Sequence, residues 1–198
     1  MNRPPLIVPT LSAGPFTLRP WRLTDLPVIR EAAADPYIPL VTTVPAAYDE
    51  AAGRAFVERQ WAKAADGAGC SFAVACQADG GGAGGGAEAD GAEAPDRAVG
   101  FVGLFPQPDD RASIGYWTAP SARGGGVAGH ALRSVAEWAL DELGLARLEL
   151  SIEPWNTGSL RAAERTGFRR EGLLRSHRTI GGERRDMYLY ALLPDDPR

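Results

Sequence analysis

A run of three glycines between a strand pattern and a helix pattern limits the fold of this chain more than any other feature. Residues 112–118 (ASIGYWT) are typical of a strand, and RGGGVAGH follows at 123–130. Residues 127–143 then predict an amphipathic helix that ends at Gly144. Its apolar face consists of Ala128, Leu132, Val135, Ala136, Ala139 and Leu143. Residues 146–153 (ARLELSIE) alternate, with Leu148, Leu150 and Ile152 on one face. Strand, helix and strand with a short return predict two parallel strands joined by a right-handed crossover.

The remaining patterns predict one mixed α/β domain over residues 16–193. Residues 1–15 are rich in proline and are expected to be irregular, and 16–21 are expected to form a strand. One helix should start at a cap formed by Thr24 and Asp25 and stop before Asp35, and a second should cover 49–65. Further strands are expected over 71–77 and 98–107, then a helix over 159–166 and two strands within 168–193. Residues 194–198 form a tail.

Residues 78–94 consist only of glycine, alanine and acidic residues. Such a segment cannot bury apolar surface and is expected to be a flexible loop. Strand patterns flank it on both sides, so we interpret it as a lengthened hairpin connection rather than a domain boundary. Lengthening a surface loop costs little free energy.

Composition excludes several classes of function. The formal net charge is -4, without the basic excess that nucleic acids or anionic membranes require. No apolar run approaches the roughly 18 residues of a spanning helix, and no signal peptide is evident, so a cytoplasmic protein is expected. Cys70 and Cys76 stand at opposite ends of one strand pattern, too far apart for a disulfide, and no cysteine or histidine cluster has zinc-ligand spacing. No metal is expected.

The glycine run has the chemistry of an anion site. Glycines allow backbone N–H groups to approach a ligand closely, and the helix that begins there adds unpaired N–H groups and a positive dipole end. A flexible connection is the plainer interpretation. Gly124, Gly126 and Gly129 also match the dinucleotide motif G-x-G-x-x-G, with Glu153 near the place of a ribose-binding acid. Residues 120–123 intervene between the strand and the first glycine, however, and too few residues remain for a doubly wound sheet.

Three motifs in order resemble one known family. Residues 123–128 (RGGGVA) fit the (Q/R)-x-x-G-x-(G/A) signature of the GCN5-related N-acetyltransferases (GNAT). Residues 156–168 fit N-x-x-S followed by E-x-x-G-F, the pattern of the RimJ/RimL-like branch that acetylates the N-termini of ribosomal proteins. The ending GFRREGLLRSHRTIGGERRDMYLYALL resembles the same branch. The resemblance is strong over 113–193 and looser over 16–107.

The resemblance implies a fold and a donor. The fold would be a central, mostly antiparallel sheet with flanking helices and one parallel pair of strands that splay apart. The donor would be acetyl-CoA, with its thioester entering the gap from one side and the amine from the other. Its pantetheine arm would pair with the backbone near Trp117 and Thr118. The residues implied in binding acetyl-CoA are Trp117, Thr118, Arg123, Gly124, Gly125, Gly126, Val127, Ala128, Asn156 and Ser159. Asn156 could instead cap the following helix.

The catalytic groups depart from the better-known members of the family. Ser151 stands on the second splayed strand where many members carry a base glutamate, so Glu149, two residues away on the same face, is the substitute candidate. A solvated strand face is the plainer interpretation of Glu149. Ala163 replaces the tyrosine that often protonates the leaving thiolate, and Ser159 is the acid that the branch implies. A free α-amine titrates near 7.7–8.0, so a weak base would suffice for such an acceptor.

The leading hypothesis is therefore an N-acetyltransferase acting on a primary amine, either a protein N-terminus or a small molecule, as a monomer or homodimer. A CoA- or acyl-CoA-binding module without catalysis remains open, because the usual glutamate and tyrosine are missing. An NAD(P)-binding enzyme is the third alternative, through the G-x-G-x-x-G match.

Overall fold

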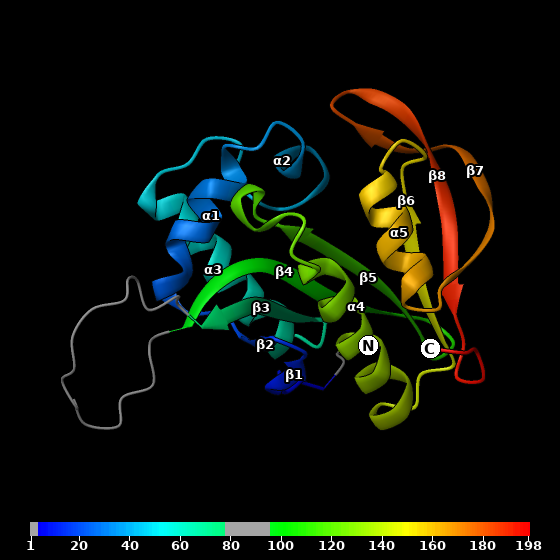
Figure 1. The fold of residues 1–198 in the computed structure, drawn as a ribbon. Coiled ribbons are helices and arrows are strands. Elements are labelled where there is room, and N and C mark those ends of the chain that lie inside the picture. The colour runs from blue at the N-terminus through cyan, green and yellow to red at the C-terminus, as the bar shows by residue number, and fades with distance from the viewer. Residues whose placement is uncertain (1–3, 78–95) are drawn as a thin grey trace, which may run out of the picture.

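An eight-stranded sheet forms the centre of the computed structural model, which describes residues 4–77 and 96–198. The strands are β1 (Leu11–Ala13), β2 (Phe16–Pro20), β3 (Cys70–Gln77), β4 (Asp96–Gln107), β5 (Arg111–Thr118), β6 (Arg147–Ile152), β7 (Arg169–Ile180) and β8 (Glu183–Leu192). Their order in the sheet is β1-β2-β3-β4-β5-β6-β8-β7. Among the described strands only β5 and β6 pair in parallel, so the mixed, mostly antiparallel sheet with one parallel pair is confirmed. Figure 1 shows β5 and β6 diverging near the middle of the molecule.

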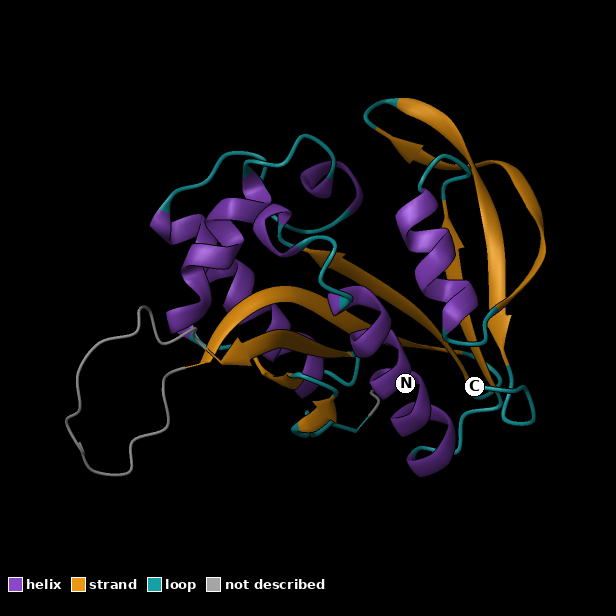
Figure 2. Cartoon of the chain, in the orientation of Figure 1, coloured by secondary structure: helices purple, strands orange, loops and turns teal. Residues whose placement is uncertain are grey.

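Helices cover both faces of this sheet (Figure 2). The N-terminal group comprises α1 (Leu26–Ala33), α2 (Ile38–Val41) and α3 (Glu50–Ala65), and the later helices are α4 (Val127–Glu137) and α5 (Thr157–Arg165). Successive side chains along each strand point to opposite faces of the sheet, so the strand residues divide between two cores. Phe72, Val102 and Leu148 belong to one core with α4. Phe101 and Trp117 belong to the other core with α1 and α3. We call these the α4 face and the α1–α3 face.

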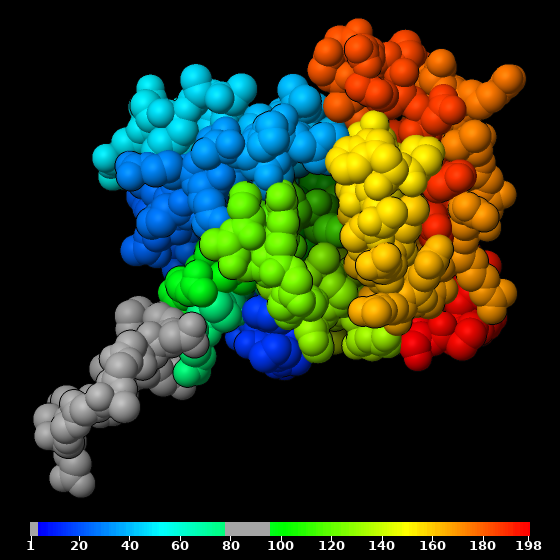
Figure 3. Space-filling model, turned by 45° about the horizontal axis from the view of Figure 1, so that its top comes forward, coloured from blue at the N-terminus to red at the C-terminus, as the bar shows by residue number. Residues whose placement is uncertain are grey.

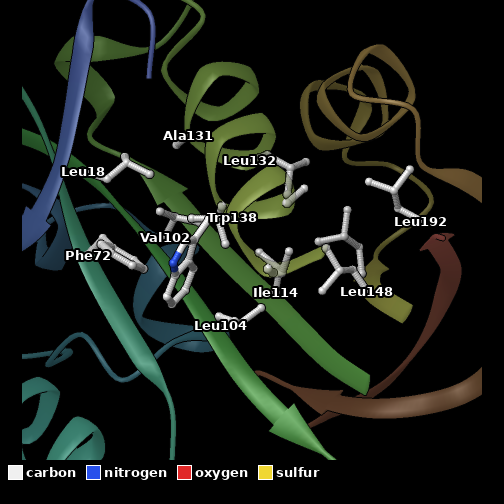
Figure 4. Close-up of a cluster of buried hydrophobic side chains, with 14 of the residues drawn as sticks. Leu18, Phe72, Val102, Leu104, Ile114, Ala131, Leu132, Trp138, Leu148 and Leu192 are labelled. Carbon is white, nitrogen blue, oxygen red and sulfur yellow. The ribbon is translucent and has the colours of Figure 1, made fainter. Parts of the chain in front are cut away.

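The α4 face carries the larger core (Figure 4). Leu132 and Val135 of α4 are fully buried against the sheet, and the Trp138 ring meets the Phe72 ring edge-on at 5.6 Å between centroids. Leu148, Leu150 and Ile152 of β6 belong to this core, as their alternation predicts. The odd-numbered residues of β6 therefore point to the α1–α3 face.

Most expected elements are present, and three differ. Leu11–Ala13, expected to be irregular, pair with β2 as β1. Asp25 does not cap α1 with its side chain; its carboxylate instead accepts hydrogen bonds from Arg19. The helix expected over 127–143 continues from Trp138 to Glu142 as a π-helix, shown by the Leu143 N–H donating to the Trp138 carbonyl at 3.1 Å. This wider turn rotates Leu143 out of the core, and it is 46% exposed.

The prediction of a flexible loop at 78–94 lies outside the described residues. Cys70 and Cys76 are free thiols at opposite ends of β3. In the parts of the chain that the structure describes, no helix is long and apolar enough to cross a membrane.

Candidate functional site

The gap between β5 and β6 is the most distinctive feature of the sheet. Their parallel pairing covers Arg111 to Ser113 and ends where Ser113 meets Glu149. Beyond this point β5 stays paired with β4, and β6 stays paired with β8. The facing edges of the two strands therefore pair with no other strand in the described chain. This leaves backbone hydrogen-bonding groups of β5 available to an extended ligand.

A cavity of about 490 Å³ passes through the sheet at this gap. Both strands contribute consecutive residues to its wall, so side chains from both sheet faces line it: residues 113–117 of β5 and residues 150–153 at the end of β6. Asn156 and Ser159 line it at the start of α5, and Tyr37, Lys63 and Arg178 line it on the α1–α3 side. Figure 3 shows a hollow between the segment before and within α4 and the helix α5. Residues on both faces of the sheet therefore line the gap.

The glycine turn lies at the start of α4, on one side of this gap. Gly124 and Gly126 have positive φ angles of 82° and 76°, which explains the need for glycine there. No side chain caps α4, and the N–H groups of residues 124–129 find no acceptor in the described chain. A Cβ at Gly124 or Gly129 would meet nothing within 4 Å, so the turn faces open space. Unpaired amides at a helix N-terminus form an anion site.

Arg123 ties this turn to α2. Its Nη2 donates to Asp35 Oδ2 at 2.7 Å, while Asp35 Oδ1 accepts from the N–H groups of Tyr37 and Ile38, each at 2.9 Å. Burial opposes ionisation of Asp35, but these two amides and Arg123 outweigh it, so the pKa of Asp35 lies below its usual value. The turn is also held to α1, because the Ser121 N–H and hydroxyl both donate to Glu31.

Asn156 and Ser159 meet at the start of α5. Asn156 Oδ1 accepts the Ser159 N–H at 3.1 Å, so Asn156 caps the helix, as one of the two interpretations predicted. The Tyr116 hydroxyl donates to the Ser159 carbonyl at 3.3 Å across the gap, and burial raises the pKa of Tyr116. The Ser159 hydroxyl has no hydrogen-bond partner among the described residues and lines the cavity.

Trp117 and Thr118 lie on the part of β5 that pairs with β4 but not with β6. The Trp117 ring points to the α1–α3 face, where it stacks on Phe101 at 6.1 Å with an 8° angle between planes. Its backbone remains on the edge that faces β6. This arrangement suits main-chain pairing with an extended ligand rather than contact through the indole ring.

Glu149 lies away from the cavity, at the closed end of the gap. Its Oε1 accepts from Arg147 Nε at 2.7 Å and from Arg111 Nη1 at 3.3 Å. It pairs with Ser113 in the last step of the parallel ladder and does not line the cavity. A carboxylate whose oxygen is held by two guanidinium groups is poorly placed to take a proton from an amine.

Glu153 and Tyr37 were not assigned to this site from the sequence. Glu153 is 3% exposed, lines the cavity and accepts a hydrogen bond from the Tyr37 hydroxyl. The Tyr37 ring in turn meets the Trp155 ring edge-on at 4.9 Å, and burial together with Glu153 raises the pKa of Tyr37. The alternation of β6 could have placed Glu153 on the face of Ser151, but the sequence gives no sign that Tyr37 reaches it.

The topology of the sheet argues against the interpretation of the glycine turn as a dinucleotide-binding motif. The G-x-G-x-x-G motif belongs to a doubly wound parallel sheet, whereas only one strand pair within residues 4–77 and 96–198 is parallel. The described residues contain no group of three or more histidine, cysteine, aspartate or glutamate side chains that could hold a metal ion.

Comparisons with known proteins agree with this geometry. The family model of the acetyltransferase (GNAT) domain matches residues 16–169. The probable N-acetyltransferase YjcK of Bacillus subtilis is 38% identical over 105 residues, which cover 51% of this chain and only 58% of that protein.

Solved structures share the fold over nearly the whole chain. RimJ of Mycobacterium smegmatis, in complex with a CoA disulfide, has a TM-score of 0.75 at 25% identity and covers 96% of this chain and 90% of its own. RimL, a ribosomal L7/L12 α-N-protein acetyltransferase in complex with coenzyme A, has a TM-score of 0.72 at 17% identity and covers 94% and 99%. The splayed strands, the uncapped glycine turn and the matched family model show that this chain belongs to the GNAT acetyltransferase family and has the fold of its RimJ/RimL-like branch.

Proposed function

We propose that the protein is an enzyme that transfers an acetyl group from acetyl-CoA to a primary amine by direct attack in a ternary complex. The observation that carries the proposal is the cavity through the sheet between β5 and β6, with an uncapped glycine turn on one side. One ligand can enter from each face and the two can meet in the gap. We propose a protein N-terminal α-amine as the acceptor, by analogy with RimL, whose name states that activity.

The residues present suit acetyl-CoA as the donor. The amides of residues 124–129 would bind the pyrophosphate, because they are unpaired and stand at the positive end of α4. The edge of β5 near Trp117 and Thr118 would pair with the pantetheine amides. Arg123 holds the turn in place through Asp35, and Asn156 fixes the start of α5.

Ser159 is the proposed acid for the leaving thiolate. Its hydroxyl lines the cavity and makes no other hydrogen bond in the described chain. Holding the amine beside the thioester supplies much of the rate, because a bimolecular step becomes effectively unimolecular. We assign no proton transfer to Glu149, since it does not line the cavity and its Oε1 accepts from Arg111 and Arg147.

Calorimetric titration followed by a thiol-release assay tests the proposal. We expect acetyl-CoA and CoA to bind and NADH and NADPH not to bind. With acetyl-CoA, a peptide that has a free N-terminal serine should release thiol, and its Nα-acetylated form should not. Tight NAD(P)H binding without CoA binding would contradict the donor. CoA binding without turnover across peptides, polyamines and amino sugars would indicate a binding module instead.

A further inference from the structure

Glu153 is the only carboxylate among the cavity-lining residues that the structure describes. An amine arrives at neutral pH mostly as an ammonium ion, so its site needs an anion to hold it and a group to accept a proton. Building on the proposed function, we propose that Glu153 binds the acceptor amine and accepts its proton before attack on the thioester.

The position of Glu153 follows from the register of β6. Glu149, Ser151 and Glu153 share the α1–α3 face, because Leu148, Leu150 and Ile152 occupy the core on the other face. Glu149 lies at the closed end of the gap, whereas Glu153 lies two residues beyond Ser151, toward the open end. The glycine turn starts the helix that covers the opposite face. Glu153 therefore stands on the side from which an acceptor would enter.

One carboxylate oxygen of Glu153 is held and the other is available. Oε2 accepts the Tyr37 hydroxyl, while Oε1 has no hydrogen bond within the described residues, its nearest cation being Arg185 Nε at 4.0 Å. Arg185 already pairs with Glu183 at 2.6 Å. A buried carboxylate that lines a cavity with a free oxygen can accept a hydrogen bond from an ammonium ion there.

Tyr37 acts as a positioning residue for this carboxylate. Its backbone N–H donates to Asp35, which is paired with Arg123 of the glycine turn. Its hydroxyl reaches across the gap to Glu153, and its ring packs on Trp155. Tyr37 therefore links the two sides of the site through separate hydrogen bonds, one from its backbone N–H toward the glycine turn and one from its hydroxyl to the acceptor carboxylate. The charged groups around the Tyr37–Glu153 pair are Arg178 of β7 and Arg185 of β8.

The proton transfers balance without a further reactant. The acceptor ammonium gives one proton to Glu153, which passes it to solvent. The neutral nitrogen then attacks the thioester carbonyl carbon, so that a C–N bond forms and the C–S bond breaks. The Ser159 hydroxyl gives its proton to the leaving thiolate. The attacking nitrogen then loses its second proton, which restores the Ser159 hydroxyl. The products are the N-acetylated amine, free CoA thiol and one proton.

Glu153→Gln tests the proposal, because it keeps the shape and removes the base. With acetyl-CoA and the serine peptide at pH 7, we expect kcat/KM to fall about 10²- to 10⁴-fold, the range for a general base. The Kd for CoA should stay within about twofold of the wild type. Glu58→Gln, an exposed carboxylate on α3 outside the cavity, is the matched control and should leave kcat/KM unchanged.

The pH dependence of kcat/KM distinguishes a catalytic role of Glu153 from a purely structural one. We expect the deficit of Glu153→Gln to shrink as pH rises above about 8, because the free α-amine then needs no base. A uniform deficit at every pH, or normal activity of Glu153→Gln at pH 7, would overturn the proposal. So would loss of activity in Glu149→Gln with full activity in Glu153→Gln.

Two further variants keep the test decisive if Glu153→Gln fails to fold. Glu153→Asp keeps the charge and should retain more activity than a neutral replacement, and Tyr37→Phe should lower kcat with little change in CoA affinity. Wild-type-like turnover in Tyr37→Phe together with no pH-dependent change in Glu153→Asp would contradict the proposal. Absence of turnover in the wild type with every amine would count against the proposed function, which is a different result.

Discussion

Single residues determine the geometry of the proposed donor site, and Gly126 is an example. It precedes α4 with a φ of 76°, and a Cβ there would stand 3.4 Å from the His130 ring. Alanine in this left-handed conformation costs about 1–2 kcal/mol. The turn can avoid this cost only by moving the amides that face the proposed pyrophosphate.

We therefore expect Gly126→Ala to weaken CoA binding about tenfold, since roughly 1.4 kcal/mol corresponds to one factor of ten. Isothermal titration calorimetry with CoA measures the effect. Gly172→Ala in β7 is the matched control, because its Cβ would meet nothing within 4 Å and its φ is not in the left-handed region. Equal affinities of the two variants would show that these amides do not bind the donor.

A second prediction at the scale of one residue concerns the contribution of Asp35 to stability at different pH values. Its folded-state pKa is lowered, so it contributes stability above the unfolded-state pKa of about 3.9, and this contribution is lost as pH falls through the lower folded-state value. We expect Asp35→Asn to unfold more easily than the wild type at pH 7. Arg123 is half exposed, so screening limits the share that comes from the ion pair.

The difference between wild type and Asp35→Asn should narrow as pH falls from about 5 toward 2. Urea unfolding at several pH values measures it. Asp195→Asn, an exposed change near the C-terminus, provides the control for a general effect of removing one carboxylate. A difference that stays constant over this pH range would mean that the Asp35 carboxylate does not contribute through its charge.

At the scale of elements, hydrophobic periodicity predicted most of the helices and strands but not the irregular helical turn after α4. The strand-helix-strand unit, the helices α1 and α3 and the C-terminal hairpin follow from local patterns, whereas the short helix α2 was not predicted. Leu143 fits the apolar face of a continuous α-helix, yet a π-helix from Trp138 to Glu142 turns it to solvent. Residue spacing in the sequence assumes one helical period and so cannot foresee this change.

Two leucines of this helical segment provide a direct comparison. Leu132 is fully buried, whereas Leu143 is 46% exposed. We expect Leu132→Ala to lower the free energy of unfolding by about 2–5 kcal/mol, because it leaves a cavity in the core. Leu143→Ala should cost well under about 1 kcal/mol, the usual range for an exposed site. Equal losses in urea unfolding would place Leu143 in the core, against the structure.

At the scale of the whole molecule, the site depends on contacts between distant segments. The sequence singled out the glycine turn, Asn156 and Ser159, which lie in local motifs. It indicated Glu149 as the substitute base and not Glu153, although both share a strand face with Ser151. Arg111 and Arg147 hold one of them, while Tyr37, over 100 residues away in the chain, meets the other. Only the folded chain brings these partners together.

The two parts of the sheet, β1–β5 and β6–β8, are joined by a parallel ladder of three residue pairs, from Arg111↔Arg147 to Ser113↔Glu149. A ligand between β5 and β6 that also binds the glycine turn would contact both parts of the sheet. Because this site exists only in the folded protein, the ligand would stabilise the native state and not the unfolded state. At a concentration of about 100 times Kd, acetyl-CoA should add roughly 2.7 kcal/mol to the free energy of unfolding. For a chain of this size, each kcal/mol raises Tm by about 2–4 °C.

Thermal unfolding with and without ligand therefore tests the donor site through the whole fold. We expect acetyl-CoA and CoA to raise Tm by about 5–10 °C at that ratio, and NADPH at the same concentration to leave it unchanged. Gly126→Ala should show a smaller rise at equal CoA, because its Kd is higher while its sheet is intact. A shift of the same size in this variant would mean that CoA binds without the turn. The glycine turn would then be a connection between β5 and α4, and the anion would have to bind elsewhere on the gap.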